Sequence, residues 1–183
     1  NAFNPKVFDP AIQHDRPADL PRGKRLFTYV GALWGDWFAW DWVVALARAN
    51  PEAQVVLIGD HRGQRPEGMA NLHLLGLRPQ AEIPAYLQHS DVCLVPHDPA
   101  RQSRAANPLT VYEYLAMGKP VVAADLPELR ELPGVLLAAN AGEFVAQVGR
   151  AQRSGRDQAA LERFAAANAW RVRVRQLERL LGA

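Results

Sequence analysis

From residue 26 onward, short apolar runs of strand length alternate with segments whose apolar residues recur at helical spacing. The strand-like runs cover residues 26–31, 54–59, 71–76, 91–96, 119–124 and 134–139, and the helical segments between them cover 36–49, 80–89, 108–117 and 127–132. Continuous apolar strands separated by helices predict a parallel sheet covered on both faces, because right-handed crossovers place the helices there. We therefore expect a doubly wound α/β domain with a six-stranded, Rossmann-like sheet in the order 3-2-1-4-5-6.

The two ends of the chain have different patterns from the middle. Residues 1–25 contain four prolines and little periodicity, which predicts an extended lead-in, or linker, before a domain that spans residues 26–183. Beyond the sheet, further helices are expected at 141–153, 157–167 and 168–181. The last of them carries one apolar stripe, made of Trp170, Val174, Leu177 and Leu181. Such a stripe predicts that the helix packs against another surface.

Composition agrees with one ordinary globular domain, since 49% of the 183 residues are hydrophobic and 22% are charged. No apolar run approaches the roughly 18 residues that a membrane-spanning helix needs, so we expect a cytoplasmic protein. The net charge of +2 is too small to indicate a nucleic-acid partner. Charge is uneven, because eight arginines against three acidic residues follow from Arg150 onward. These basic helices suit a solvated face, a partner domain or a peripheral contact with the inner membrane face.

A ligand crevice is expected where the strand order reverses, between the first and fourth strands. The loops that open onto it are residues 31–37 and 96–108. Asn107 suits a helix N-cap and Pro108 the first helical position, which leaves the amides of Leu109 and Thr110 without intrahelical acceptors. Free amides and the positive end of the helix dipole favour an anion such as a diphosphate.

Glu113 follows about 6 Å farther along the helix axis than Leu109. A carboxylate at this position suits two sugar hydroxyls rather than a phosphate. The free amides and the carboxylate together therefore suit a ribosyl diphosphate. The alternative is an ordinary capped helix with an exposed glutamate, and the pattern alone does not separate the two.

The sequence NPLTVYEYLAMGKPVVAADLPELRE, residues 107–131, resembles the donor-binding segment of group 1, family 4 retaining glycosyltransferases, which have the two-domain GT-B fold. YVGAL, VVLIGD and LHLLGLRPQAEIPAYLQHSDVCLVP resemble the first four strands of the family's C-terminal domain, and NAFNPKVFDP resembles the linker that enters it. The resemblance covers almost the whole chain. It implies that the chain is the donor-binding half of a longer enzyme, whose acceptor-binding N-terminal domain precedes Asn1.

Family roles can be carried over residue by residue. Glu113 matches the second glutamate of the E-x7-E motif, which holds the ribose hydroxyls, whereas the first glutamate is replaced by Ala105. The family's phosphate loop falls on Asn107, Pro108, Leu109 and Thr110, and its glycine beside the diphosphate falls on Gly31. Its nucleobase contact falls on Leu75, Gly76 and Leu77, and Arg78 is expected over that pocket.

Two cations that commonly neutralise the leaving diphosphate in this family are missing after Gly31, where the sequence continues with Ala32 and contains no Lys or Arg up to Trp42. Arg101 and Arg104, in the loop before the helix, are the nearest replacements, and each also suits a solvated loop position. A leaving diphosphate needs its developing charge stabilised. These departures put full catalytic competence in doubt.

Two more residues are candidates for contact with the donor. Trp34, in the loop beside the crevice, suits stacking on a sugar or nucleobase, and also contact with the absent domain. His97 and Asp98 follow the fourth strand and are expected to face the crevice. Two potential metal ligands without a third do not indicate a metal site. The resemblance implies no cofactor and no metal, only a nucleoside diphosphate sugar as donor substrate.

We therefore expect the nucleotide-sugar-binding domain of a retaining glycosyltransferase, which moves a sugar to an acceptor hydroxyl in cell-surface polysaccharide or glycolipid synthesis. The isolated domain is expected to bind donor weakly and to transfer nothing. Two alternatives stay open: a noncatalytic nucleotide-binding or interaction module with an eroded site, and a nucleotide-sugar epimerase of similar fold.

Overall fold

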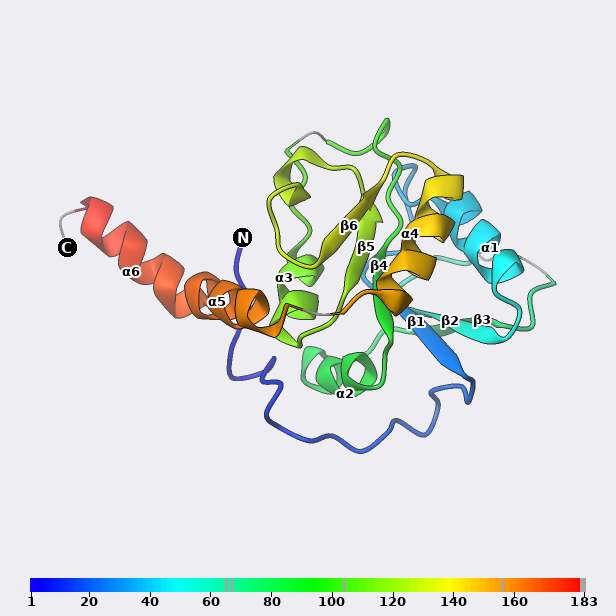
Figure 1. Cartoon of the computed structure of the whole chain (residues 1–183), viewed down its shortest axis with the longest axis horizontal. Helices are drawn as coiled ribbons and strands as arrows, with labels where there is room; N and C mark the ends of the chain where they lie inside the picture. The colour runs from blue at the N-terminus through cyan, green and yellow to red at the C-terminus, as the bar shows by residue number, and fades with distance from the viewer. Residues whose placement is uncertain (65, 67, 104, 156, 182–183) are drawn as a thin grey trace.

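A computed structural model describes residues 1–183 except residues 65, 67, 104, 156, 182 and 183. Its centre is one parallel sheet (Figure 1) whose strands are β1 (Arg25–Val30), β2 (Ala53–Ile58), β3 (Leu72–Gly76), β4 (Val92–Val95), β5 (Val121–Ala124) and β6 (Val135–Ala138). The strand order is β3-β2-β1-β4-β5-β6, and every neighbouring pair is parallel. The doubly wound fold and the strand order predicted from the sequence are therefore confirmed.

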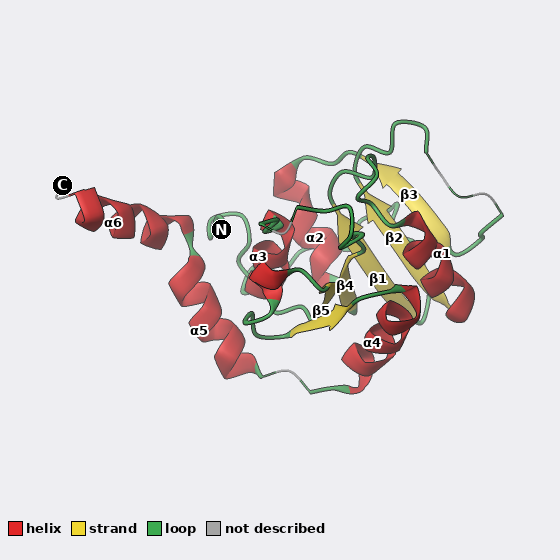
Figure 2. Cartoon of the chain, turned by 90° about the horizontal axis from the view of Figure 1, so that it is seen from above, coloured by secondary structure: helices red, strands yellow, loops and turns green. Residues whose placement is uncertain are grey.

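Helices cover both faces of this sheet, as Figure 2 shows. They are α1 (Trp40–Ala49), α2 (Ile83–Gln88), α3 (Leu109–Ala116), α4 (Ala141–Arg153), α5 (Gln158–Asn168) and α6 (Trp170–Leu181), with short 3-10 turns η1 (Gln80–Glu82) and η2 (Pro127–Leu129). Helices α1 and α4 pack together on one face, where the rings of Trp42 and Phe144 are 5.3 Å apart. Helices α2 and α3 lie on the other face.

Two expected helices are shorter than the apolar pattern indicated. The pattern over 36–49 becomes helical only at Trp40, and the pattern over 127–132 gives only the turn η2. In the first case Phe38 forms an antiparallel bridge with His97 and Ala39 has a ψ of 80°, so the helix cannot extend back through these residues. An apolar residue packs on the core equally well from a loop, so spacing alone did not mark these ends.

The lead-in, residues 1–25, forms no helix but packs closely on the domain. Phe3, Phe8 and Leu20 are buried in its core. Phe3 forms a parallel bridge with Ala169 at the α5–α6 junction, and farther along the lead-in the amide of His14 donates to the side chain of Gln88 at the end of α2. The segment therefore contributes apolar side chains to this domain rather than hanging free.

Helix α5 packs on α3, where Tyr112 and Phe164 have ring centroids 5.4 Å apart, but α6 projects away from the body (Figure 1). The expectation that the α6 stripe packs against another surface is wrong within this chain. Its side chains are exposed, from 47% for Trp170 to 81% for Leu181. Only the start of α6 is held, because Phe3 accepts a hydrogen bond from the Trp170 amide. Among the described residues, no helix combines the length and the apolar character needed to cross a bilayer.

Candidate functional site

A cavity of about 520 Å³ opens at the carboxyl ends of β1, β2 and β3, beside the first turns of α3. Five of the residues predicted from the sequence line it: Gly31, Trp34, Leu77, Leu109 and Glu113. Arg78, expected over the nucleobase pocket, lines it too, whereas sequence reasoning missed several other lining residues, of which Gly59, Asp60, Arg62 and Gln80 carry the chemistry. The cavity lies at the carboxyl edge of the sheet, where ligands bind in open α/β sheets, but on the β1–β3 side of the expected crevice: the loop 31–37 lines it, and no described residue of the loop 96–108 does.

The turn after β1 is held close to the turn after β2 by two glycines. The Gly31 amide donates to the Ile58 carbonyl over 2.9 Å. A Cβ on Gly59 would overlap the Gly31 carbonyl oxygen, and a Cβ on Gly31 would lie 2.5 Å from the Tyr29 hydroxyl, which donates to Ala32. Glycine is thus needed at both positions, because the Gly31 backbone occupies the space for a side chain at Gly59 and the Tyr29 side chain occupies it at Gly31.

Tyr114 fixes α3 against the end of β1. Its ring is fully buried, and its hydroxyl accepts a hydrogen bond of 2.7 Å from the Val30 amide. The same hydroxyl lies 3.4 Å from the Val30 carbonyl, to which it donates. The sequence offered one signal for this contact: a tyrosine that is buried needs a hydrogen-bond partner for its hydroxyl.

The start of α3 differs from expectation by one residue. The helix begins at Leu109, and Pro108 is the capping residue, with an extended ψ of 120° and no side-chain hydrogen bond. Asn107 is therefore not the N-cap; its side-chain amide donates instead to the Tyr112 hydroxyl over 3.2 Å. No described residue accepts a hydrogen bond from the amides of Leu109 and Thr110. The predicted free amides are thus present without the predicted cap.

Glu113 stands one turn later and turns its carboxylate into the cavity. Its side chain is only 5% exposed, and Gln80 donates a hydrogen bond of 3.0 Å to one carboxylate oxygen. Burial raises the pKa of Glu113 to about 7, although the hydrogen bond from Gln80 acts in the opposite direction. The second carboxylate oxygen has no partner among the described residues, so the group is free to accept hydrogen bonds from a ligand.

His97 does not face the crevice, so that expectation is wrong. It is 5% exposed, with one ring nitrogen 3.3 Å from the Tyr29 hydroxyl and the other 3.2 Å from the Gln102 amide. The ring of Trp37 covers it edge-on at 4.7 Å. Burial lowers the pKa of His97 to about 4, which makes it a neutral packing residue at physiological pH.

The remaining candidates lie around the cavity rather than in it. Leu75 and Gly76 end β3, and the Gly76 carbonyl accepts a hydrogen bond from Gly59. Arg101 is mostly exposed, 3.4 Å from Asp98, and does not line the cavity. Arg104, the other candidate for phosphate contact, lies outside the described residues.

Two arginines line the cavity from loops that had given no phosphate-binding signal. Arg62 follows β2, with its guanidinium carbon 3.8 Å above the ring of Trp34. Arg78 follows β3 and pairs with Asp19 of the lead-in. Both loops leave the same edge of the sheet as the loop after β1, and that shared edge is the signal by which Arg62 could have been found. Among the described residues, no group of three or more His, Cys, Asp or Glu side chains is arranged to hold a metal ion.

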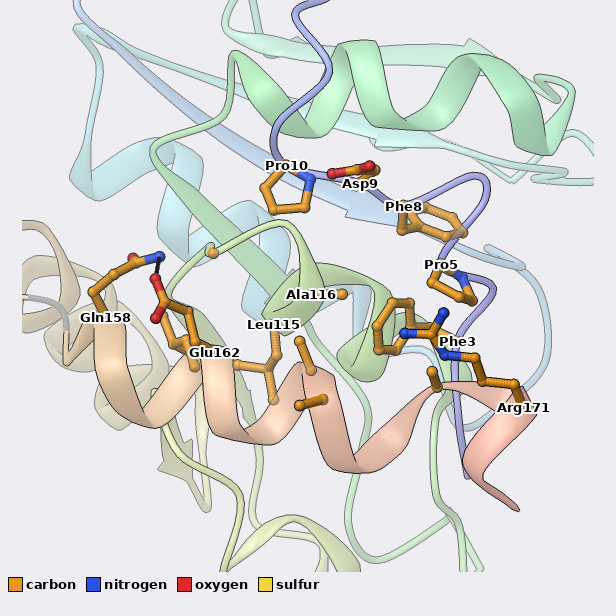
Figure 3. A pocket seen from close by; sticks show the side chains of 15 residues that line it. Phe3, Pro5, Phe8, Asp9, Pro10, Leu115, Ala116, Gln158, Glu162 and Arg171 are labelled. Atoms are coloured by element: carbon orange, nitrogen blue, oxygen red, sulfur yellow. Dashed lines mark hydrogen bonds between the residues drawn. The ribbon is translucent and has the colours of Figure 1, made fainter. Parts of the chain in front are cut away.

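A second hollow, of about 350 Å³, lies between the lead-in and α5 (Figure 3). Phe3, Pro5 and Phe8 form one wall, and Leu115 and Ala116, at the end of α3, line it as well. Asp9, Glu162 and Arg171 also line it, and the negative end of the α3 dipole disfavours an anion there. The cavity at the carboxyl ends of the strands is therefore the better candidate site.

Comparisons with known proteins agree with this geometry. The family model for glycosyl transferases group 1 matches residues 24–153. Over 74 residues the chain is 31% identical to TuaH of Bacillus subtilis, a glycosyltransferase whose name places it in teichuronic acid biosynthesis; the match covers 40% of this chain and 19% of TuaH.

Solved structures show the same fold. A sucrose-phosphate synthase from Thermosynechococcus elongatus matches 98% of this chain with a TM-score of 0.71 at 21% identity, and HepE from Anabaena, solved with UDP and glucose, matches 100% with a TM-score of 0.68 at 17% identity. The chain covers only 51% and 56% of these two structures, about half of their length. With a family model matched over most of its sequence, the chain belongs to the group 1 glycosyl transferases.

Proposed function

We propose that this chain is the nucleotide-sugar-binding half of a retaining glycosyltransferase, which moves a sugar from a nucleoside diphosphate sugar to an acceptor hydroxyl. One observation carries the proposal: the buried carboxylate of Glu113 and the start of α3, with its free amides, border the same cavity as the close-packed turn at Gly31. A carboxylate suits the two ribose hydroxyls, and helix-terminal amides suit the diphosphate. The expected nucleobase position is the end of β3, near Leu77.

Relatives support the choice of nucleotide for the first test. The structure of HepE contains UDP and glucose, and the α,α-trehalose-phosphate synthase from Burkholderia xenovorans is named as UDP-forming. The name of TuaH supports a role in cell-surface polysaccharide synthesis. UDP is therefore the first diphosphate to try, followed by GDP, ADP and dTDP. The acceptor would be bound by a separate domain.

The transfer itself is proposed by family resemblance. The acceptor oxygen would attack from the face that the diphosphate leaves, and the departing phosphate oxygen would help to take its proton. The chain's own residues hold the leaving group in this scheme, and none serves as general base. The isolated 183 residues are thus expected to bind donor without transferring sugar, an outcome that sugar transfer by this chain alone would contradict.

A second candidate function is a noncatalytic nucleotide-binding or interaction module. Two observations favour it: Ala105 stands where the family has its first motif glutamate, and Ala32 follows Gly31 where a cation is common. The module would bind nucleotide poorly or not at all. The two functions are therefore separated by affinity.

Titration calorimetry with the four nucleoside diphosphates tests the proposal. We expect one of them to bind at or below millimolar concentration, and the Glu113→Ala substitution to weaken that binding by about 1 to 3 kcal/mol, because two hydrogen bonds to a charged group are lost. Glu52→Ala is the matched control, since Glu52 is exposed and pairs with Lys24 at the amino end of β2. Failure of all four diphosphates to bind would favour the noncatalytic module. An unchanged affinity in Glu113→Ala would remove Glu113 from the site.

A further inference from the structure

The cavity must neutralise a diphosphate without the two basic residues that its family commonly places after the first strand. This question arises only if the proposed function holds, since it concerns the same site. Among the described residues that line the cavity, the cations are Arg62 and Arg78. Their other contacts decide which of the two is available to a ligand.

The guanidinium of Arg78 already has partners within the chain. A terminal nitrogen of its guanidinium lies 2.6 Å from Asp19, and its Nε donates to the Tyr86 hydroxyl over 3.0 Å. The side chain is 27% exposed, and the contact with Asp19 holds the pKa of Arg78 above its usual range. A ligand anion would have to compete with a short, partly buried ion pair.

Arg62 is held much more loosely. Its Nε lies 3.6 Å from the Asp60 carboxylate, and the two side chains are 61% and 45% exposed. A pair of this kind contributes about 0 to 1 kcal/mol, so an arriving diphosphate can replace it at little cost. No described residue accepts a hydrogen bond from either terminal nitrogen of Arg62. These two nitrogens are the fork that binds phosphate oxygens in pairs.

The backbone around Arg62 positions the side chain over the cavity. Arg62 and Gly63 both have left-handed φ angles, 46° and 81°, which form a tight turn in the loop after β2. The Asp60 carboxylate accepts a hydrogen bond of 3.0 Å from the Arg62 amide and so stabilises that turn. Trp34, on the loop after β1, supplies the flat face on which the guanidinium rests at 3.8 Å. The guanidinium therefore lies on the wall of the cavity, stacked on Trp34.

We propose that Arg62 supplies the positive charge that neutralises the donor's diphosphate, with Trp34 as the platform that orients its guanidinium. The neutralising charge of this site then comes from the loop after β2 instead of the loop after β1. This assignment also explains how the site can hold a diphosphate although Ala32 follows Gly31. It assigns no phosphate contact to Arg101, which lies outside the cavity.

The test compares wild-type chain with Arg62→Gln, Arg62→Asn, Arg101→Gln and Arg25→Gln by titration with UDP, GDP, ADP and dTDP and with the matching nucleosides. Asparagine is included because it tolerates a left-handed φ, so it keeps the turn if glutamine does not. Arg25 is the matched control: it is half-exposed, lies 3.5 Å from Asp91 and stands at the opposite end of β1. Thermal melting checks that each variant is folded.

We expect both Arg62 variants to bind the diphosphate about ten- to a hundredfold more weakly, with nucleoside affinity unchanged, because one charge-assisted phosphate contact is lost. Arg101→Gln and Arg25→Gln should stay within twofold of wild type. If the Arg62 variants bind diphosphate as wild type does, or if the Arg25 control is weakened equally, the inference is wrong while the proposed function stands. If wild type binds none of the four diphosphates, the proposed function itself fails, and the role of Arg62 with it.

Discussion

At the scale of single residues, Glu113 has a surrounding that suits a binding group better than a structural one. A buried carboxylate with one hydrogen bond, from Gln80, is costly to keep ionised, and its pKa near 7 reflects that cost. Ribose hydroxyls would donate to the charged form and relieve it. Without ligand, the ionised form of Glu113 should therefore lower the free energy of unfolding by an amount that depends on pH.

The penalty has a definite sign. Folding raises the pKa of Glu113 from about 4.5 to about 7, so between these values the folded state binds more protons than the unfolded state, and stability falls as pH rises. We expect Glu113→Gln to gain about 1 to 3 kcal/mol relative to wild type when pH increases from 5 to 8. Urea unfolding of both proteins at the two pH values measures this. A stability difference that does not change with pH would show that Glu113 is not desolvated.

Sequence reasoning placed some site residues well and others badly, for physical reasons. Glu113 and Leu109 were predictable because their spacing along one helix is fixed. His97 was not, because its burial depends on Trp37 and Gln102, whose positions follow from long-range packing. Arg62 was missed because no local pattern brings the loop after β2 against Trp34.

At the scale of elements, the strands followed from continuous apolar runs, which are a local signal of a covered parallel sheet. Their order followed from the common arrangement of doubly wound sheets rather than from the runs themselves. The pattern of apolar residues does not predict how closely the loops approach one another. The turns after β1 and β2 touch at Gly31 and Gly59, and Tyr114 ties α3 to the same place. These contacts between elements set the shape of the cavity.

Gly59→Ala tests that arrangement. A methyl group at this position would collide with the Gly31 carbonyl, so the two turns must separate. We expect a loss of about 1 to 3 kcal/mol in the free energy of unfolding, together with weaker nucleotide binding. Urea unfolding and UDP titration measure the two effects.

Gly149→Ala is the control for that substitution. Gly149 lies inside α4, where alanine should be neutral or stabilising by up to about 1 kcal/mol. If Gly59→Ala and Gly149→Ala behaved alike in both measurements, the close approach of the two turns would have no role in fold or binding.

At the scale of the whole molecule, the lead-in and α6 depart most from a simple Rossmann-like domain. The lead-in buries Phe3 and Phe8, and through Asp19 it holds Arg78 at the rim of the cavity. Neither contact was predictable, because a proline-rich segment has no periodicity to read. The apolar stripe of α6 was predicted correctly, but its side chains are exposed instead of packed.

The central claim is that the cavity bordered by the start of α3 and by Glu113 is the nucleotide-diphosphate site. Amide chemical shifts of the 183-residue chain, recorded during titration with UDP, GDP, ADP or dTDP, test it most directly. We predict that the largest changes fall on the turns at Gly31 and Gly59 and at the start of α3, at Leu109 and Thr110. Changes gathered instead around Phe8 and Glu162, in the hollow of Figure 3, would contradict the account.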